Sequence, residues 1–296
     1  MEPQQAQILD GKLVAEHTLQ KIMHEVEGLK SKNICPKLSI ILVGENPASI
    51  SYIRQKRKSC EKVGIIDDQI NFSETISEKE LLNKIKELNK DNSVHGILVQ
   101  LPLPKHINER KIIEAINPVK DVDGFHPVNI GKMFLGKDYE ELSPCTPSGI
   151  IKILEYYKID VVGKEITIVG RSNIVGKPVS TMLTNRSATV TTCHSKTKDL
   201  KFHTSRADIL IVAIGRANFI TADMVKEGAI VIDVGMNRVE DPNSKTNYRL
   251  TGDVDFENIV KKAKAITPAP GGCGPMTVAC LIENTIKATK ILNSII

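Results

Sequence analysis

The chain has 296 residues, of which 41% are hydrophobic and 25% charged, and its formal net charge is +5. This length is sufficient for two domains with separate cores, and the composition is ordinary for a globular protein. Trp is absent, aromatic residues make up 4% and no zinc-finger spacing occurs, which argues against nucleic-acid binding.

The sequence also gives no sign of a membrane or secreted protein. No apolar run approaches the ~20 residues that span a bilayer, and the N-terminus has no signal-peptide core. The six cysteines form no C-x-x-C pair, which is typical of reduced, mostly buried thiols in the cytosol. We therefore expect a cytoplasmic protein with no membrane partner and no bound metal.

The first half of the chain alternates strand patterns with helix patterns. Ser77 and Glu80 form a capping-box pattern, and Asn108 is placed to open a later helix that Asn117-Pro118 ends. Strands alternating with helices of this length predict βαβ units with parallel strands. The predicted strands cover residues 37–43, 65–72 and 95–100, and the first two predicted helices cover residues 48–63 and 77–90.

The second half repeats this alternation. A helix is expected to start near Thr146-Pro147-Ser148, with Ser148 as its cap, and the polar segment 240–248 is expected to be an exposed loop. The predicted strands cover residues 166–169, 188–193, 208–213 and 229–234, and a long amphipathic helix is predicted over residues 276–292. Gly215 and Gly235 each follow a strand, where open α/β sheets bind ligands.

The segment Gly170–Pro178 is a glycine-containing turn between a predicted strand and a predicted helix. Such a turn lets backbone N–H groups approach a phosphate at the positive end of a helix. It is not a P-loop, because five residues separate Gly170 from Gly176-Lys177 and Pro178 replaces the Ser or Thr that binds Mg²⁺. Ser172 occupies the second glycine position of G-x-G-x-x-G, so an ordinary βα loop stays an alternative for this segment alone.

The tip of the next strand indicates which dinucleotide would bind. An acid there would accept from the ribose 2′-hydroxyl of NAD, but no acid occurs between Thr189 and Lys198. Ser195 offers a hydroxyl there, and Arg171 and Lys196 offer positive charge. The sequence therefore favours NADP over NAD.

Tyr52 and Lys56 lie four residues apart in the helix predicted over residues 48–63, so they share one helical face. A phenol beside an amine can stack on a flat heterocycle and move protons. The alternative is a solvated basic helix face, because the dense basic cluster of the chain spans Arg54–Lys58.

Three further segments carry candidate ligand contacts. Gln100 ends a strand before a Leu-Pro-Leu-Pro exit, and Asp121 and Asp123 form a carboxylate pair at a turn that also fits a plain Asp-Gly turn. Residues 267–276, the PGG segment, hold three glycines and three prolines, which indicates a rigid backbone that another group approaches closely. We expect Thr277 and the helix start beside it to add free N–H donors.

The motifs Y-x-x-x-K, QLPLP, DVDGF, GRSNIVGKP, ATVTTCHSKT and PGGCGPMT occur in that order. With them the chain resembles the bifunctional methylenetetrahydrofolate dehydrogenase/methenyltetrahydrofolate cyclohydrolase family over essentially its full length. The resemblance implies two α/β domains flanking a cleft: a folate domain of residues 1–145 completed by the C-terminal helix 276–296, and a Rossmann-type NADP domain of residues 146–275. It also implies tetrahydrofolate substrates and a homodimer.

The resemblance further implies roles for individual residues. Tyr52 would stack on the folate, Lys56 would be the catalytic lysine with Gln100 as its partner, and Asp123 would bind the pterin. Other substrate contacts would come from Leu101, Pro270, Gly271 and Gly272. Cofactor contacts would come from Gly170, Arg171, Ser172, Ile174, Ser195, Gly215, Met236 and Thr277.

The chain departs from the family pattern at Ala269 and Cys273, where valine is common, and neither departure changes charge. Some relatives keep only the dehydrogenase, so a monofunctional NAD(P) dehydrogenase is one alternative. A non-catalytic nucleotide- or RNA-binding module is a second alternative. An amino-acid dehydrogenase with a similar layout is a third, but it leaves Tyr52, Lys56 and the PGG segment unexplained.

Overall fold

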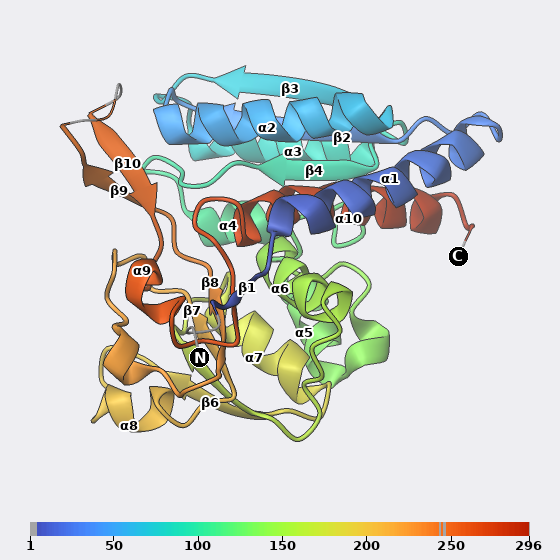
Figure 1. The fold of residues 1–296 in the computed structure, drawn as a ribbon. Helices are drawn as coiled ribbons and strands as arrows, with labels where there is room; N and C mark the ends of the chain where they lie inside the picture. The colour runs from blue at the N-terminus through green and yellow to red at the C-terminus, as the bar shows by residue number, and fades with distance from the viewer. Residues whose placement is uncertain (1–4, 243, 245–246, 296) are drawn as a thin grey trace. The chain divides into compact units, whose positions relative to one another are not determined.

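The computed structural model describes residues 5–242, 244 and 247–295. The chain forms two compact α/β units (Figure 1). The N-terminal unit comprises Glu16–Cys145 and Val278–Ile296, and the C-terminal unit comprises Met1–Ala15 and Thr146–Thr277. Most of the C-terminal helix thus belongs to the N-terminal unit, and the chain up to Ala15 belongs to the C-terminal unit.

The N-terminal unit is built on a parallel three-stranded sheet in the order β3-β2-β4. The strands are β2 (Lys37–Val43), β3 (Ile66–Phe72) and β4 (Gly96–Val99), each within one residue of its predicted bounds. Alternate side chains of the sheet point to opposite faces. Ile41 and Val99 pack into a core with Leu81 and Ile85 of α3 (Glu78–Lys90).

The helices of this unit begin where local hydrogen bonds favour them. The predicted capping box of α3 is confirmed, because the Ser77 hydroxyl accepts from the Glu80 N–H and the Glu80 carboxylate accepts from the Ser77 N–H. Asn108 caps α4 as predicted, accepting from the N–H groups of Arg110 and Lys111. The remaining elements are α2 (Pro47–Val63), α4 (Glu109–Ala115), α5 (Pro127–Leu135) and the 3₁₀ turn η1 (Lys137–Tyr139).

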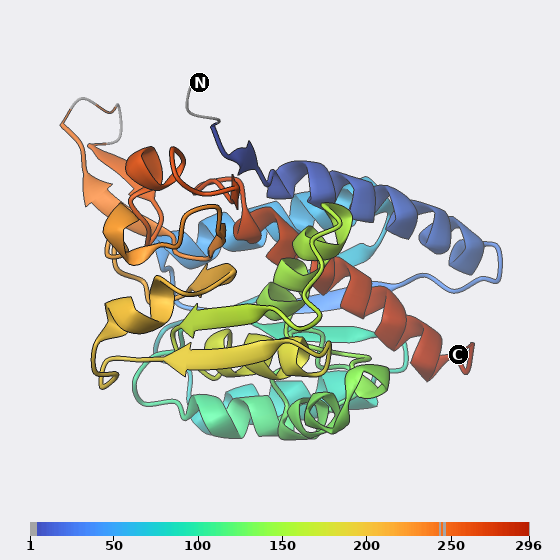
Figure 2. The ribbon, with the colours of Figure 1, turned by 60° about the horizontal axis from the view of Figure 1, so that its bottom comes forward.

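Two long helices, α1 (Gly11–Lys30) and α10 (Cys273–Leu292), complete the unit and run side by side in Figures 1 and 2. An ion pair joins Lys290 to Glu25 at 2.5 Å. Helix α1 was not among the predicted elements, although its buried residues Val14, Ile22 and Val26 follow helical spacing. Helix α10 starts three residues before the predicted Met276.

The C-terminal unit holds a six-stranded parallel sheet in the order β1-β11-β8-β7-β5-β6. Figure 2 shows β5 and β6 running in the same direction. Strand β5 has β6 on one side and β7 on the other, which makes the β5/β7 border the switch point where such sheets bind ligands. The strands are β1 (Gln7–Ile8), β5 (Glu165–Val169), β6 (Thr189–Cys193), β7 (Ile209–Val212), β8 (Ile230–Asp233) and β11 (Ala265–Ile266).

Pairing of β1 with β11 explains why the start of the chain belongs to this unit. Gln7 and Ile8 are in register with Ala265 and Ile266. The backbones of Gly11 and Gly272 also approach so closely that a Cβ at Gly11 would lie 1.8 Å from the Gly272 carbonyl oxygen.

The other elements of this unit are α6 (Cys145–Tyr156), α7 (Gly176–Thr184), α8 (Leu200–Thr204), η2 (Ala222–Met224), α9 (Phe256–Ile259) and the antiparallel pair β9 (Asn237–Glu240) and β10 (Tyr248–Thr251). The predicted cap at Ser148 is wrong, because α6 begins at Cys145 and Ser148 lies inside it. The predicted loop 240–248 connects β9 to β10; residues 243, 245 and 246 of it lie outside the described residues. No helix among the described residues is long and apolar enough to cross a membrane.

Candidate active site and nucleotide site

Lys56 and Gln100 form the centre of a candidate active site in the N-terminal unit. Lys56, on α2, is only 8% exposed, and its Nζ donates to Gln100 Oε1 at 2.9 Å. Gln100 follows β4, where its N–H donates to the Ile41 carbonyl and its Nε2 donates to the Leu101 carbonyl at 2.7 Å. The amide side chain therefore has a fixed direction, and it presents an oxygen to the amine.

Asp123 adds a carboxylate to this pair. Burial raises the pKa of Asp123 to about 6, while the nearby Lys56 and a hydrogen bond from the Cys145 thiol act in the opposite direction. Lys56 thus donates to an amide oxygen and also acts on the charge of a nearby carboxylate. A partly buried acid that titrates near neutral pH is typical of ligand-binding and catalytic sites.

Asp121, the other half of the predicted carboxylate pair, has a different task. It is 2% exposed and accepts from the N–H groups of Gly124 and His126 and from Asn129 Nδ2, at 3.1, 2.7 and 2.9 Å. Burial raises its pKa although these hydrogen bonds oppose the shift. Asp121 therefore shapes the turn that carries Asp123.

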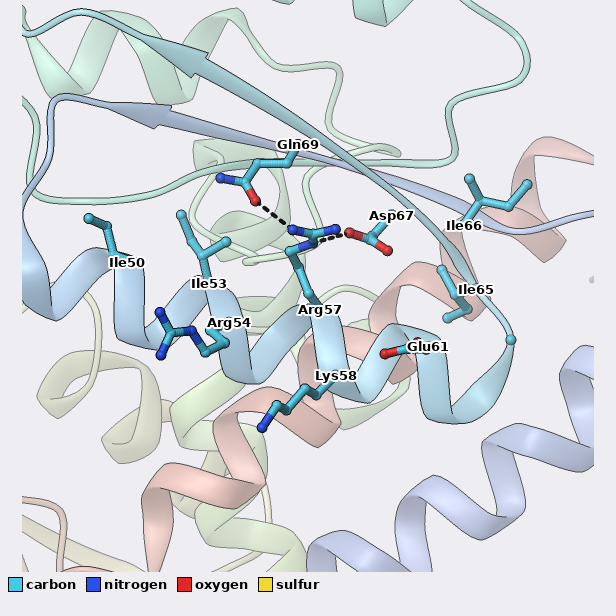
Figure 3. Close-up of a pocket in the computed structure, with 11 residues that line it drawn as sticks. Ile50, Ile53, Arg54, Arg57, Lys58, Glu61, Ile65, Ile66, Asp67 and Gln69 are labelled. Carbon is cyan, nitrogen blue, oxygen red and sulfur yellow. Dashed lines mark hydrogen bonds and ion pairs between the residues drawn. The ribbon is translucent and has the colours of Figure 1, made fainter.

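Tyr52 is 39% exposed, one helical turn before Lys56. The rest of the basic cluster lies on the other face of α2, where Arg54, Arg57 and Lys58 line a hollow of about 670 Å³ together with edge strand β3 (Figure 3). Arg57 is paired there with Asp67 and Gln69. This hollow contains neither Tyr52 nor Lys56, and the helix separates the two faces.

Sequence reasoning missed two side chains that hold the Asp123 turn. Asn284 of α10 donates from Nδ2 to the carbonyls of Val122 and Ser143, both at 2.9 Å. Lys120 is 2% exposed, and its Nζ donates to the carbonyls of Leu88, Asn89 and Asp91 at the end of α3. A polar residue on the buried face of an amphipathic helix was a usable signal for Asn284, whereas the sequence around Lys120 offered none.

The glycine turn after β5 forms a tight cradle at the switch point. Gly170 has φ of +135°, and a Cβ there would lie 2.3 Å from the Ala213 carbonyl oxygen; a Cβ at Gly176 would lie 2.2 Å from the Gly170 carbonyl oxygen. Arg171 and Ile174 are exposed at this turn. The Ser172 hydroxyl accepts from the N–H groups of Val175 and Gly176 at 3.2 and 3.3 Å, so part of its capacity stabilises the turn itself.

The tip of β6 carries no acid, as the sequence predicted. Ser195 and Lys196 are exposed, and the next acid, Asp199, caps α8 by accepting from the Phe202 N–H. Among the described residues, no ion-pair partner is present for Arg171 or Lys196. A strand tip with an exposed lysine, a nearby exposed arginine and no acid suits an anionic phosphate better than the neutral 2′-hydroxyl of a ribose.

The remaining predicted cofactor residues also lie in the C-terminal unit. Gly215 follows β7 with φ of +65°, and Met236, 39% exposed, follows β8. Thr277 lies inside α10, and its hydroxyl is bonded to that of Thr146 at 2.9 Å and to the Cys273 carbonyl at 3.2 Å. The free N–H groups of this helix therefore belong to its first turn from Cys273, and the expectation that Thr277 marks them is wrong.

The PGG segment belongs to the C-terminal unit as well. Pro270 is exposed, whereas Gly271 and Gly272 are buried, and the Gly271 carbonyl accepts from the Lys12 N–H at 3.2 Å. The close backbone approach predicted for this segment is thus partly to the start of α1. No cluster of His, Cys, Asp or Glu suited to a metal occurs among the described residues.

A parallel sheet with a glycine cradle at its switch point, in a chain whose second α/β unit holds a buried lysine, defines a two-domain α/β enzyme with a nucleotide-binding domain. Residues 9–123 match the family model described as "Tetrahydrofolate dehydrogenase/cyclohydrolase, catalytic domain", and residues 144–293 match the NAD(P)-binding domain of the same description. The chain belongs to the tetrahydrofolate dehydrogenase/cyclohydrolase family.

Relatives agree with this assignment over nearly the whole chain. The chain is 55% identical to the "Bifunctional protein FolD" of Nautilia profundicola and 53% identical to that of Bacillus subtilis, with 96% of this chain and 97% or 98% of the relative covered. A crystal structure of the bifunctional FolD from Campylobacter jejuni has a TM-score of 0.92 at 50% identity, covering 97% of this chain and 99% of that one. The Trypanosoma brucei dehydrogenase-cyclohydrolase, complexed with NADP and an inhibitor, has a TM-score of 0.93 at 36% identity, covering 98% and 99%.

Proposed function

We propose that this chain carries both activities of its family on a single polypeptide. It oxidises 5,10-methylenetetrahydrofolate to 5,10-methenyltetrahydrofolate with NADP and then hydrolyses the methenyl compound to 10-formyltetrahydrofolate. The observation that supports the second activity most strongly is the buried Lys56 amine, 2.9 Å from Gln100 Oε1 and close to Asp123.

Hydrolysis needs groups that handle protons. Water adds to the methenyl carbon and loses one proton, which leaves a hydroxyl on that carbon. The hydroxyl then loses its proton as the formyl C=O forms, the bond from the carbon to N5 breaks, and N5 takes up a proton, so the step releases one proton overall. Lys56 is our candidate for this proton transfer, with Gln100 fixing the direction of the amine. In this proposal Tyr52 stacks on the folate and Asp123 accepts from the N–H edge of the pterin.

The C-terminal unit fits a dinucleotide. The cradle of Gly170 and Gly176 has no room for a Cβ, so the backbone is free to approach a pyrophosphate. Ser195, Lys196 and Arg171 would hold the 2′-phosphate of NADP. Bound NADP supplies the hydride acceptor for the oxidation, and the protein aligns the substrate with it.

Lys56→Met tests the assignment of the proton-transfer group. The variant is expected to lose methenyl hydrolysis by roughly 10²-fold or more, the range of general acid–base catalysis. Lys58→Met is the matched control, because Lys58 is exposed and lines the hollow on the opposite face of α2. Parental hydrolysis in Lys56→Met would remove Lys56 from this role.

The principal alternative is a monofunctional dehydrogenase on the same fold. A monofunctional dehydrogenase would form NADPH but would hydrolyse added methenyltetrahydrofolate no faster than the reaction without enzyme. A hydrolysis assay without NADP therefore separates it from the bifunctional enzyme. On the family resemblance we also infer a homodimer and a cytoplasmic location. Sedimentation of the full chain at several concentrations tests the first inference, and fractionation of the native cells tests the second.

A further inference from the structure

Two buried carboxylates in the C-terminal unit have no part in the function described so far. Asp253 is 0% exposed and Asp233 is 3% exposed. Asp233 ends β8, and Asp253 follows β10. Both lie among the loops at the carboxyl ends of the parallel strands, where the nucleotide-binding residues also lie.

Asp253 binds the backbone of the loop that follows β7. Its Oδ2 accepts from the N–H groups of Ile214 and Gly215 at 2.7 and 3.0 Å, and its Oδ1 accepts from the Arg216 N–H at 2.8 Å. Oδ1 also accepts at 2.9 Å from Nδ2 of Asn237, the first residue of β9. Four donors converge on one side chain, which matches the two acceptor oxygens of a carboxylate.

Asp233 holds Asp253 in turn. Its Oδ1 accepts from the N–H groups of Asp253 and Gly235, both at 2.9 Å, and its Oδ2 accepts from the Val254 N–H at 3.2 Å. Its own N–H donates to the Thr267 hydroxyl at 2.8 Å, at the start of the PGG segment.

Glycines make this close packing possible. A Cβ at Gly235 would lie 2.2 Å from the carboxylate of Asp253, and a Cβ at Gly252 would lie 1.7 Å from that of Asp233. The sequence therefore keeps space for both acids. Bonds to charged acceptors in such a dry site are stronger than neutral ones.

We propose that Asp253 is a positioning residue for NADP: it fixes the Ile214–Arg216 backbone at the switch point, and Asp233 holds Asp253 in place. The loop borders the glycine cradle, because Ala213, one residue before it, contacts Gly170. All three of its N–H groups are already bound, so its shape is set before any ligand arrives. The proposal rests on the use of NADP proposed above.

Asp253→Asn keeps the size of the side chain but replaces one acceptor oxygen with an NH₂ group. In either orientation this NH₂ faces two N–H donors, so the loop must move. We expect the NADP dissociation constant, measured by titration calorimetry on the full chain, to rise roughly tenfold or more. The KM for NADP should rise in parallel, whereas methenyl hydrolysis without NADP should stay within about twofold of wild type. Asp223→Asn, a surface acid paired with Lys201 in the same unit, is the control and should change neither.

The two readouts separate this proposal from others. NADP binding by the wild type tests the proposed function, whereas the difference between wild type and Asp253→Asn tests the positioning role. An unchanged NADP dissociation constant would overturn the role. Equal loss of NADP binding and of hydrolysis would also overturn it, because Asp253 would then support the fold in general.

Asn237→Ala gives a second and milder variant, because it removes one donor from Asp253 and leaves both carboxylates in place. A several-fold rise in the NADP dissociation constant supports the proposal, and a wild-type value contradicts it.

Discussion

Asp123 is the residue whose charge changes closest to neutral pH at the candidate active site. Burial raises its pKa from 3.8 to about 6. A raised carboxyl pKa means that the acid is largely neutral below pH 6 and ionised above it. Only the ionised form is a strong acceptor for the N–H edge of a pterin.

We therefore predict that kcat/KM for methylenetetrahydrofolate falls as the pH decreases through about 6, because this ratio reports the free enzyme. Asp123→Asn should lower kcat/KM at neutral pH by about tenfold or more and remove this part of the pH profile. Asp138→Asn, in η1 of the same unit, is the control. A wild-type pH profile in Asp123→Asn would exclude Asp123 as the titrating group.

Ser195 sets the predicted cofactor preference. Ser195→Asp places a negative charge at the tip of β6, so it should repel a 2′-phosphate and shift the NADP-to-NAD ratio of kcat/KM toward NAD by about tenfold, or about 1.4 kcal/mol. Ser187→Asp adds the same charge in the turn before β6 and should leave the ratio unchanged. If Ser195→Asp kept the same NADP-to-NAD ratio as Ser187→Asp, Ser195 would not contact the 2′-phosphate of NADP.

The sequence identified single residues best where chemistry and spacing agreed. The absence of an acid at the tip of β6 could be read from the residues, whereas the pairing of Lys56 with Gln100 and the choice of Asp123 over Asp121 came from the family resemblance. The residues alone did not separate the two acids, because both lie in one Asp-Val-Asp turn and only burial and hydrogen bonds distinguish them. Asp253 was missed because its three backbone donors lie 37 to 39 residues earlier in the chain, and the fourth donor, Asn237, lies 16 residues earlier.

At the scale of elements, Lys120 connects the end of α3 to the turn that carries Asp123. Its Nζ donates to the carbonyls of Leu88 and Asn89 in the last turn of α3, where a helix leaves carbonyls without partners, and to the Asp91 carbonyl, which also accepts from the Val94 N–H. Burial lowers the pKa of this amine. The three carbonyls are its hydrogen-bond acceptors in the protein interior.

Lys120→Met should lower the free energy of unfolding by about 2–3 kcal/mol, because it removes the Nζ donor from the carbonyls of Leu88 and Asn89 and leaves the Asp91 carbonyl with only the Val94 N–H. Urea denaturation measures this change. Lys90→Met, at an exposed position in the last turn of α3, should cost about 0.5 kcal/mol or less. Equal costs for the two variants would show that Lys120 contributes only as part of the helix surface.

Elements with a local signal were predicted well, and elements that depend on distant partners were not. The capping box at Ser77 and the cap at Asn108 are short-range patterns, and both are confirmed. The two-residue strand β1 pairs with Ala265 and Ile266 near the other end of the chain, so no local sequence pattern predicts this strand. Ser148 fitted a cap by type, but α6 begins earlier, at Cys145.

For the whole molecule, the chain changes unit after Ala15, Cys145 and Thr277. The predicted boundary near residue 145 lies at one of these changes. The change after Ala15 could not be predicted, because it depends on the pairing of β1 with β11 and on the approach of Gly11 to Gly272, both near the other end of the chain. Lys56, Gln100 and Asp123 lie in the N-terminal unit and the glycine cradle of Gly170 and Gly176 lies in the C-terminal unit, so substitutions can alter these two groups separately.

The central claim is that one chain performs both the oxidation and the hydrolysis. The most direct test mixes the purified wild-type chain with 5,10-methylenetetrahydrofolate and NADP and follows NADPH, methenyltetrahydrofolate and 10-formyltetrahydrofolate together. We predict that NADPH and 10-formyltetrahydrofolate accumulate in equal amounts, with methenyltetrahydrofolate passing through a low maximum. Two results would contradict the claim. In the first, NADPH forms but methenyltetrahydrofolate accumulates and is hydrolysed no faster than without enzyme; in the second, no NADPH forms at all.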